Sequence, residues 1–453
     1  MDYRIEKDSM GEVKVAKDKL WKAQTQRSVN NFHIGKEKMP LELIHSIVVL
    51  KKAIALVHCD NDKMSKEKTK SIVYACDQIL ESKFDDQFPL SVWQTGSGTQ
   101  SNMNINEVIS SIANMEFDTK VHPNDDVNKS QSTNDVFPSG MHIASYIMIK
   151  DKLLPALDRL LDSFKEFYLG LDDIIKVGRT HLQDATPLRV NQEVSGWIYS
   201  LEKAKEQLEL NIGQLRHLAI GGSAVGTGIN TYENFGSMVV DKLNQLTGKD
   251  FEPSANKFYS LSSKNEMLVV HSILNALAME LLRIGNDIRW LSSGPRAGIG
   301  EYIIPSNEPG SSIMPGKVNP TQVEALSMVC AQVFGNQTSI SFAASQGNFQ
   351  LNVYMPLIAY NMLQSIELLS DMMDSFDKNL VKGISIDRDV IESNLKNSLM
   401  TVTALNPYIG YDNSARLAKF AHENGMNLYE ANEQLKILAQ EDLIKYLDPK
   451  KMV

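Results

Sequence analysis

One segment of the sequence brings together residue types that could bind and activate an anion. Residues 310–320 read GSSIMPGKVNP, with two hydroxyls, a lysine and an asparagine between glycines and prolines. Glycine permits unusual backbone angles and proline interrupts a helix, so we expect a polar, mobile loop. A helical pattern follows, and Pro320 is well placed to open that helix. Lys317 and Asn319 beside a helix N-terminus predict an anion receptor, although Ser, Gly and Pro are also ordinary loop residues.

Three further breaks in the helical pattern share a composition rich in Ser, Thr and Asn. They read WQTGSGTQSNMN at 93–104, VHPNDDVNKSQSTND at 121–135 and GRTHLQDATP at 178–187. Neutral donors of this kind, together with one lysine, suit a small, flat, multiply anionic ligand. Helix capping explains any single one of these residues equally well. The candidate ligand-binding side chains are Ser97, Thr99, Asn102, Ser132, Thr133, Asn134, Thr180 and His181.

His181 is the histidine best placed for proton transfer. It lies in a polar break after Arg179 and Thr180, and imidazole exchanges protons near neutral pH. Glu324, one to two turns into the helix after residue 320, is a candidate to orient the ring through a hydrogen bond. This pairing is a hypothesis. His122 is a second candidate for proton transfer.

Composition and motifs narrow the class of protein. The net charge of −9 argues against binding to nucleic acid, and the three cysteines are too far apart for a zinc site or a redox pair. The N-terminus lacks an apolar signal core, and no apolar run approaches the roughly 20 residues of a membrane span. No metal set, dinucleotide fingerprint, P-loop or nucleophile elbow is present. We expect a cytoplasmic protein with free thiols and no metal.

The elements that must position these segments are mainly long helices. Apolar residues recur at intervals of three and four in stretches at 139–171, 189–218, 262–292, 320–345 and 350–380. Helices of about 30 residues are roughly 45 Å long, which predicts an elongated bundle. Their wide apolar arcs favour assembly with copies of the same chain, with a large multilayer monomer as the alternative. Pro155 is expected to kink the first stretch.

The four polar segments together resemble the signature blocks of the fumarase/aspartase superfamily of lyases. GSSIMPGKVNP is similar to the superfamily signature, and the other three resemble blocks of class II fumarases, in the same order along essentially the whole chain. The QTGSGTQ form at 94–100, Gly316 and the pair Thr321 and Gln322 look like fumarase. Aspartate ammonia-lyase is the alternative activity, and a non-catalytic protein that keeps the fold is a third possibility.

The resemblance implies a mainly α fold of three domains. These are an N-terminal mostly helical lyase domain at 1–135, a central bundle of long helices at 136–360, and at 361–453 the end of the bundle with a small helical domain. Four copies would join in a twenty-helix core, and each active site would draw loops from three subunits. The implied reaction is the reversible, stereospecific hydration of fumarate to (S)-malate in the tricarboxylic acid cycle. It needs no cofactor.

The resemblance also implies residue roles. Ser311 matches the family's catalytic base, Lys317 and Asn319 would stabilise an aci-carboxylate, and His181, oriented by Glu324, would be the other proton-transfer group. The substrate would be held by Ser97, Gly98, Thr99, Ser132, Thr133, Asn134, Thr180, Ser312, Lys317, Val318 and Asn319.

A second anion site is implied at His122, Pro123, Asn124 and Asp125. Two departures from the family pattern concern these binding sites. Thr133 replaces a usual serine, which keeps the hydroxyl. Thr119 stands where some members carry an arginine for the second site, which predicts weaker anion binding there.

Overall fold

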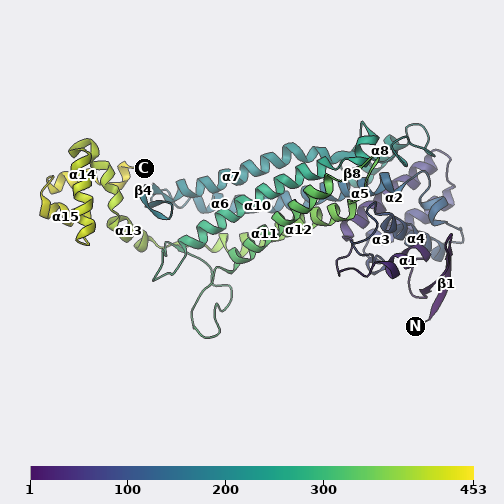
Figure 1. Ribbon diagram of the computed structural model, residues 1–453, viewed down its shortest axis with the longest axis horizontal. Coiled ribbons are helices and arrows are strands. Elements are labelled where there is room, and N and C mark those ends of the chain that lie inside the picture. Colours follow the sequence, from purple (N-terminus) through teal and green to yellow (C-terminus); the bar gives the residue numbers. More distant parts are fainter. Residues whose placement is uncertain (1) are drawn as a thin grey trace. The chain divides into compact units, whose positions relative to one another are not determined.

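The computed structural model describes residues 2–453 and is mainly helical (Figure 1). Contacts within the chain define two compact units, each built from three stretches of sequence. Unit 1 comprises the described part of Met1–Pro155 with Glu206–Ala278 and Ala331–Ser370, and unit 2 comprises Ala156–Lys205, Met279–Cys330 and Asp371–Val453. The three domains expected from the resemblance stay a prediction.

The helices that lie wholly in unit 1 include α2, whose sequence is apolar over most of its circumference. Twelve of its side chains are buried, and the helix packs against α3, α5 and α8. These helices are α1 (Ala23–Asn31), α2 (Leu41–Asp60), α3 (Lys66–Leu80), α4 (Thr99–Glu116), α5 (Thr133–Met148), α8 (Phe235–Thr247) and α9 (Lys257–Ser262). A hairpin of β1 (Tyr3–Asp8) and β2 (Gly11–Ala16), which the sequence patterns did not predict, precedes them.

The five long apolar stretches all form helices, as predicted. The first is divided, because a π-helical turn at Ile149–Leu153 precedes Pro155, whose nitrogen has no hydrogen to donate to a helical hydrogen bond. The resulting helices are α6 (Leu154–Tyr168), α7 (Val190–Asn211), α10 (Asn265–Leu291), α11 (Thr321–Ala344) and α12 (Met355–Asn379).

Helix α10 corrects one expectation about membrane spans. It contains an 18-residue window of mean hydropathy 1.6 and is long and apolar enough to cross a bilayer by length and composition. The expectation that no apolar run approaches this length is therefore wrong. The core helix of a globular bundle meets the same test, and Met267, Val270, Leu274 and Leu277 of α10 are buried inside the chain.

The segment after residue 380 is helical, as predicted. Its first helix, α13 (Arg388–Asn397), begins at Asp387, whose carboxylate accepts a hydrogen bond from the Val390 amide at 3.0 Å. The remaining helices are α14 (Asn406–Glu423), α15 (Leu428–Leu435) and α16 (Gln440–Tyr446). Helix α14 is divided by a kink at Gly410, whose φ of 78° and ψ of 160° are not helical, so two helical segments meet there.

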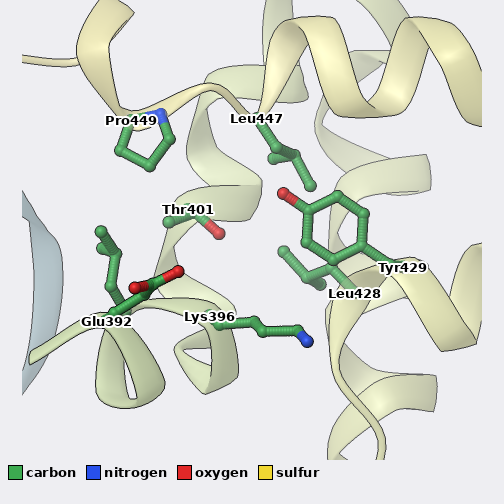
Figure 2. Close-up of a pocket in the computed structure, with 8 residues that line it drawn as sticks. Glu392, Lys396, Thr401, Leu428, Tyr429, Leu447 and Pro449 are labelled. Atoms are coloured by element: carbon green, nitrogen blue, oxygen red, sulfur yellow. The ribbon is translucent and has the colours of Figure 1, made fainter. Parts of the chain in front are cut away.

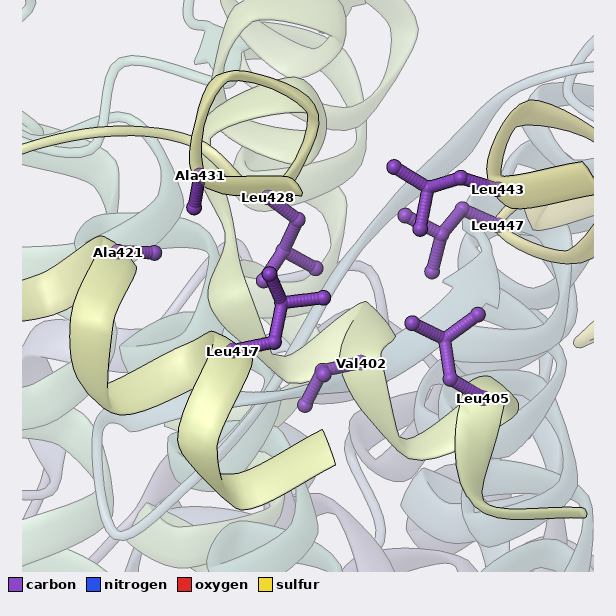
Figure 3. Close-up of a cluster of buried hydrophobic side chains, with 8 residues drawn as sticks. All are labelled: Val402, Leu405, Leu417, Ala421, Leu428, Ala431, Leu443 and Leu447. Atoms are coloured by element: carbon purple, nitrogen blue, oxygen red, sulfur yellow. The ribbon is translucent and has the colours of Figure 1, made fainter. Parts of the chain in front are cut away.

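These C-terminal helices border a small open cavity and share an apolar core. The cavity has a volume of about 380 Å³, and none of the predicted site residues lines it (Figure 2). Leu428 and Leu447 belong both to its lining and to the core behind it (Figure 3). The buried members of the core are Val402, Leu405, Leu417, Ala421, Leu428, Ala431, Leu443 and Leu447.

The stability of unit 1 is expected to depend on pH through His271 of α10. The ring is fully buried, with Nδ1 2.6 Å from Gln337 Oε1 and Nε2 2.8 Å from Ser365 Oγ. Burial lowers the pKa of His271 to about 4, against 6.5 in an unfolded chain. Between pH 6.5 and 4 the unfolded state therefore binds a proton at His271 that the folded state does not bind. As a result, the free energy of unfolding falls as pH drops through this range.

Replacing His271 with glutamine should remove this contribution. As the pH drops from 6.5 toward 4, the free energy of unfolding of the variant should fall by about 1.4 kcal/mol less per pH unit than that of the unmodified chain. Urea unfolding at several pH values measures the difference. His422→Gln, at an exposed position, is the matched control and should keep the original pH dependence. An equal slope for the unmodified chain and His271→Gln would contradict the assignment.

Candidate active site

The loop at residues 310–320, in unit 2, surrounds the Ser311 hydroxyl with backbone donors. The amide nitrogens of Ile313 and Met314 lie 3.3 and 3.1 Å from Ser311 Oγ and both donate to it. Donors aimed at an oxygen favour its negatively charged form. The loop geometry therefore suits a serine that gives up its proton.

The two ends of this loop are tied together by side chains that the sequence singled out. Asn319 Nδ2 donates to the Gly310 carbonyl at 2.6 Å, and Lys317 Nζ donates to Asn319 Oδ1. A Cβ on residue 310 would lie 2.0 Å from the Lys317 carbonyl oxygen, so only glycine fits there. Lys317 and Asn319 thus form one polar group at the start of α11.

A cavity of about 700 Å³ lies behind the loop. It is lined by Met314 to Val318 of the loop, by Tyr302 to Ile304, by Arg289 near the end of α10, and by Ser292 just after that helix. The outer face of the loop is exposed, with Ile313 83% accessible. A loop that rests over a hollow and not on a packed core has few contacts to break when it moves, which favours the predicted mobility.

His181 lies at the tip of a β-hairpin, and not in an irregular break as the sequence suggested. Strands β3 (Ile175–Thr180) and β4 (Gln183–Arg189) pair antiparallel, and His181 and Leu182 form the two-residue turn between them. Both turn residues have positive φ, 57° and 58°, as a type I′ turn requires. Such a conformation is costly for residues other than glycine, and its presence points to a functional constraint.

The His181 side chain is exposed at the hairpin tip. Within residues 2–453 it makes no side-chain hydrogen bond, so its ring nitrogens are available for a ligand or a neighbouring molecule. Glu324, the fourth residue of α11, is also exposed, and no hydrogen bond joins it to His181 within the described chain. The expected pairing of these two side chains stays a prediction.

The first two polar segments meet in unit 1. Ser97 Oγ and Thr99 Oγ1 are 2.8 Å apart at the start of α4, where Gly98 is the N-cap. One turn further along, Asn102 Nδ2 donates to the Thr133 hydroxyl at 3.0 Å. Segments about thirty residues apart in sequence are therefore connected by hydrogen bonds, which supports a common binding surface.

The residues after position 131 form the N-terminal cap of α5. Ser132 is the N-cap of α5: its hydroxyl accepts from the Asn134 amide at 3.2 Å, and Asp135 accepts from the Ser132 amide at 2.9 Å. Burial raises the pKa of Asp135 to about 6. The capping interpretation is thus confirmed for Ser132. Asn134 Nδ2 donates to the Ala224 carbonyl at 2.8 Å, which leaves the amide oxygen of Asn134 without a protein donor among the described residues.

Sequence reasoning missed Lys51, a fully buried lysine beneath these segments. Lys51 Nζ lies 2.9 Å from Gln131 Oε1 and 3.3 Å from Asn128 Oδ1, and Asn102 donates to that same Asn128 oxygen at 3.2 Å. Burial lowers the pKa of Lys51 to about 7. The available signal was a lysine on the buried face of an apolar helix, where a charge needs partners.

The segment predicted as a second anion site forms one exposed turn. His122 is the N-cap of the π-helical turn Pro123–Val127, and its Nδ1 accepts from the amides of Asn124 and Asp125 at 3.3 and 3.1 Å. Lys68 Nζ lies 2.8 and 2.9 Å from the oxygens of Asp126. The four predicted residues are therefore brought together on the surface of unit 1.

Among residues 2–453, no group of three or more His, Cys, Asp or Glu side chains is arranged to hold a metal ion. The three cysteines are free, with Cys76 and Cys330 buried and Cys59 half-buried. The chemistry that the polar segments offer is hydrogen bonding, proton transfer and the charge of Lys317.

Comparison with known proteins first defines the class. A family profile described as "Lyase" matches residues 11–335, and one described as "Fumarase C C-terminus" matches residues 402–453. A class II fumarate hydratase of Bacillus subtilis is 53% identical over all of this chain and 99% of its own length. That of Campylobacter jejuni is also 53% identical, with the same coverage.

The solved structures agree. The class II fumarase of Schistosoma mansoni has a TM-score of 0.96 and 40% identity, covering 100% of this chain and 99% of its own. The chain therefore belongs to this lyase family, within the class II fumarate hydratases.

Two glycines of the site test how tightly its loops are constrained. Gly98 has φ 76°, and a Cβ there would lie 2.3 Å from the Phe137 ring, whereas Gly316 has φ 80° with open space around it. Gly98→Ala should lower stability by about 2–4 kcal/mol through strain and overlap together. Gly316→Ala, the matched control, should cost about 1–2 kcal/mol through strain alone. Denaturant unfolding of both variants measures the difference, and equal losses would refute the packing argument.

Proposed function

We propose that this class II fumarate hydratase interconverts fumarate and (S)-malate by general acid–base catalysis. The observation that carries the proposal is the Ser311 loop, where two backbone amides donate to one hydroxyl in the loop that also carries Lys317 and Asn319. Full-length likeness to proteins named class II fumarate hydratase supports it. Dehydration of malate begins at a weakly acidic carbon, so it requires a strong base and a stabilised carbanion.

Ser311 is the proposed base. As the alkoxide, it takes the proton from the carbon next to one carboxylate of malate and becomes the hydroxyl, and the electron pair of the broken carbon–hydrogen bond moves onto that carboxylate as an aci-carboxylate. Lys317 and Asn319 stabilise the charge as it develops, because a cation and an amide donor lie at the helix N-terminus of α11. Loop closure would exclude water and strengthen these interactions.

His181 is the proposed second proton-transfer group. It donates a proton to the departing hydroxyl, which leaves as water when the carbon–oxygen bond breaks, and Glu324 of another subunit orients the ring. The exposure of both side chains supports such a contact between copies. The remaining polar groups hold the two carboxylates: Ser97, Gly98, Thr99, Ser132, Thr133, Asn134, Thr180, Ser312 and Val318.

We further propose a cytoplasmic homotetramer with sites shared between subunits. The long helices expose apolar side chains that a monomer leaves in water, including Met279 at 51%, Met328 at 68% and Phe342 at 59%. His122, Pro123, Asn124 and Asp125 would form an auxiliary anion site. Its affinity for anions is expected to be low, because Thr119 brings no positive charge where some members of the family carry an arginine.

The reaction and its base are tested by removing the Ser311 hydroxyl. Purified protein given malate alone should produce fumarate, detected by its ultraviolet absorbance. Ser311→Ala should lower kcat by about 10²–10⁴-fold, because no other group replaces the base. Ser306→Ala, an exposed serine in the same stretch, is the control and should keep full turnover. Ammonia-dependent turnover of aspartate without turnover of malate would instead indicate an aspartate ammonia-lyase.

The shared site is tested by complementation. His181→Asn should lose several orders of magnitude of turnover, as Ser311→Ala should. Because a site needs Ser311 from one copy and His181 from another, denaturing and refolding the two variants together should restore roughly a quarter of the original turnover. Each variant refolded alone is the control. A monomer by light scattering, or a mixture as inactive as its parts, would overturn the shared site.

A further inference from the structure

A buried ion cluster lies behind the hairpin that carries His181. At its centre is Glu301, which has no exposed surface. Arg179 donates to it from both terminal nitrogens: Nη1 is 3.0 Å from Oε2 and Nη2 is 2.7 Å from Oε1. Lys176, which is 1% exposed, places its Nζ 3.1 Å from the same carboxylate. Two cations from strand β3 thus converge on one carboxylate.

The cluster is balanced and keeps Glu301 ionised. Burial acts to raise the pKa of Glu301, but the hydrogen bonds from Arg179 and the charge of Lys176 outweigh burial, and the pKa is lowered. Lys176 also pairs with Glu193 at 2.9 and 3.0 Å, and the Tyr302 hydroxyl donates to Glu193 at 2.8 Å. Every charge in the cluster therefore has a partner, as buried charges require.

The position of Arg179 gives the cluster a consequence beyond stability. Arg179 precedes Thr180 and His181, and the pairing of β3 with β4 shifts register between Val177 and Arg179. Past Arg179, Thr180 and the two turn residues are exposed. The two-point hydrogen bonding of Arg179 to the buried Glu301 carboxylate is therefore the last buried side-chain contact of β3 before the turn.

Helix α13 reaches the same carboxylate. Asn394 Nδ2 donates to Glu301 Oε1 at 3.2 Å, and the Asp387 amide donates to the Glu301 carbonyl at 2.9 Å. The segment containing Glu301 also pairs with the chain just before α13, since β7 (Tyr302–Ile303) and β10 (Ser385–Ile386) are antiparallel partners. The carboxylate thus joins the hairpin to the first helix of the C-terminal segment.

We propose that Glu301 is a positioning residue: through Arg179 it fixes the direction in which the turn presents His181, and Asn394 couples α13 to that geometry. The proposal rests on the proton-transfer role proposed for His181. Its physical basis is that Arg binds a carboxylate in a planar two-point arrangement, which restrains orientation as well as distance. A displacement of about 1 Å in a catalytic group costs up to about 100-fold in rate.

The first experiment separates positioning from binding. Glu301→Gln and Arg179→Lys should each lower kcat for malate by about 10- to 100-fold, with KM changed by less than about threefold, because the turn loses its restraint while the carboxylate-binding segments stay intact. If Glu301→Gln does not fold, Arg179→Lys carries the test, since it keeps the charge and loses only the two-point geometry.

The matched control is Asp377→Asn. Asp377 is also a fully buried carboxylate in unit 2, and it pairs with Lys382 at 2.7 Å, but no hydrogen bond or ion pair connects it to the hairpin among the described residues. It should keep the original kcat. An equal loss of kcat in Asp377→Asn and Glu301→Gln would show that general weakening of the fold is responsible, and would overturn the proposal.

A double-mutant cycle decides whether Glu301 acts through His181. In a His181→Asn background, Glu301→Gln should cause no further loss of turnover, measured as fumarate accumulated over hours. A further loss as large as in the unmodified chain would overturn positioning. If His181→Asn alone keeps full turnover, the proposed role of His181 fails, and positioning with it. If His181→Asn is impaired while Glu301→Gln and Arg179→Lys keep the original kcat, positioning alone fails.

Discussion

An ionisable group that is removed from water must be met by opposite charges or hydrogen bonds, and both units of this chain place such a group behind polar groups of the proposed site. In unit 1 this group is Lys51, which reaches the Thr133 hydroxyl through Asn128 and Asn102. In unit 2 it is Glu301, which holds Arg179 beside the His181 turn. The polar side chains of the proposed site are thus held in place by hydrogen bonds that lead back to the buried Lys51 and Glu301.

The backbone contributes a second kind of restraint, because the proposed catalytic groups lie where regular structure ends. Ser311 and Lys317 precede the first turn of α11, Gly98 caps α4 in a left-handed conformation, and His181 occupies a left-handed position between two strands. Helix ends leave amide hydrogens free for anions, and tight turns project side chains away from the fold. Long helices and a short hairpin therefore supply what a site for a small dicarboxylate requires: free donors on a rigid frame.

Much of the helical fold follows from the sequence, because apolar residues at intervals of three and four leave one face to bury and so determine α10, α11 and α12 closely. The hairpins do not follow in this way. Strands β3 and β4 are polar over much of their length, and their turn carries neither Asn nor Gly, so 178–187 resembles an irregular break. The hydropathy of α10 was underestimated from the sequence, which was expected to contain no apolar run of membrane-spanning length. A helix in a large core can be as apolar as one in a membrane.

By itself the sequence determined the residue types and the order of the four polar segments, and these sufficed to indicate the family and the kind of chemistry. The tertiary structure decided which partners hold those residues. Lys51 meets Gln131 across 80 residues of sequence, and Arg179 meets Glu301 across 122. The local sequence around each residue does not predict such pairs. A hydrogen-bond partner is selected by which polar groups are buried together, and burial is a property of packing between elements that are distant along the chain.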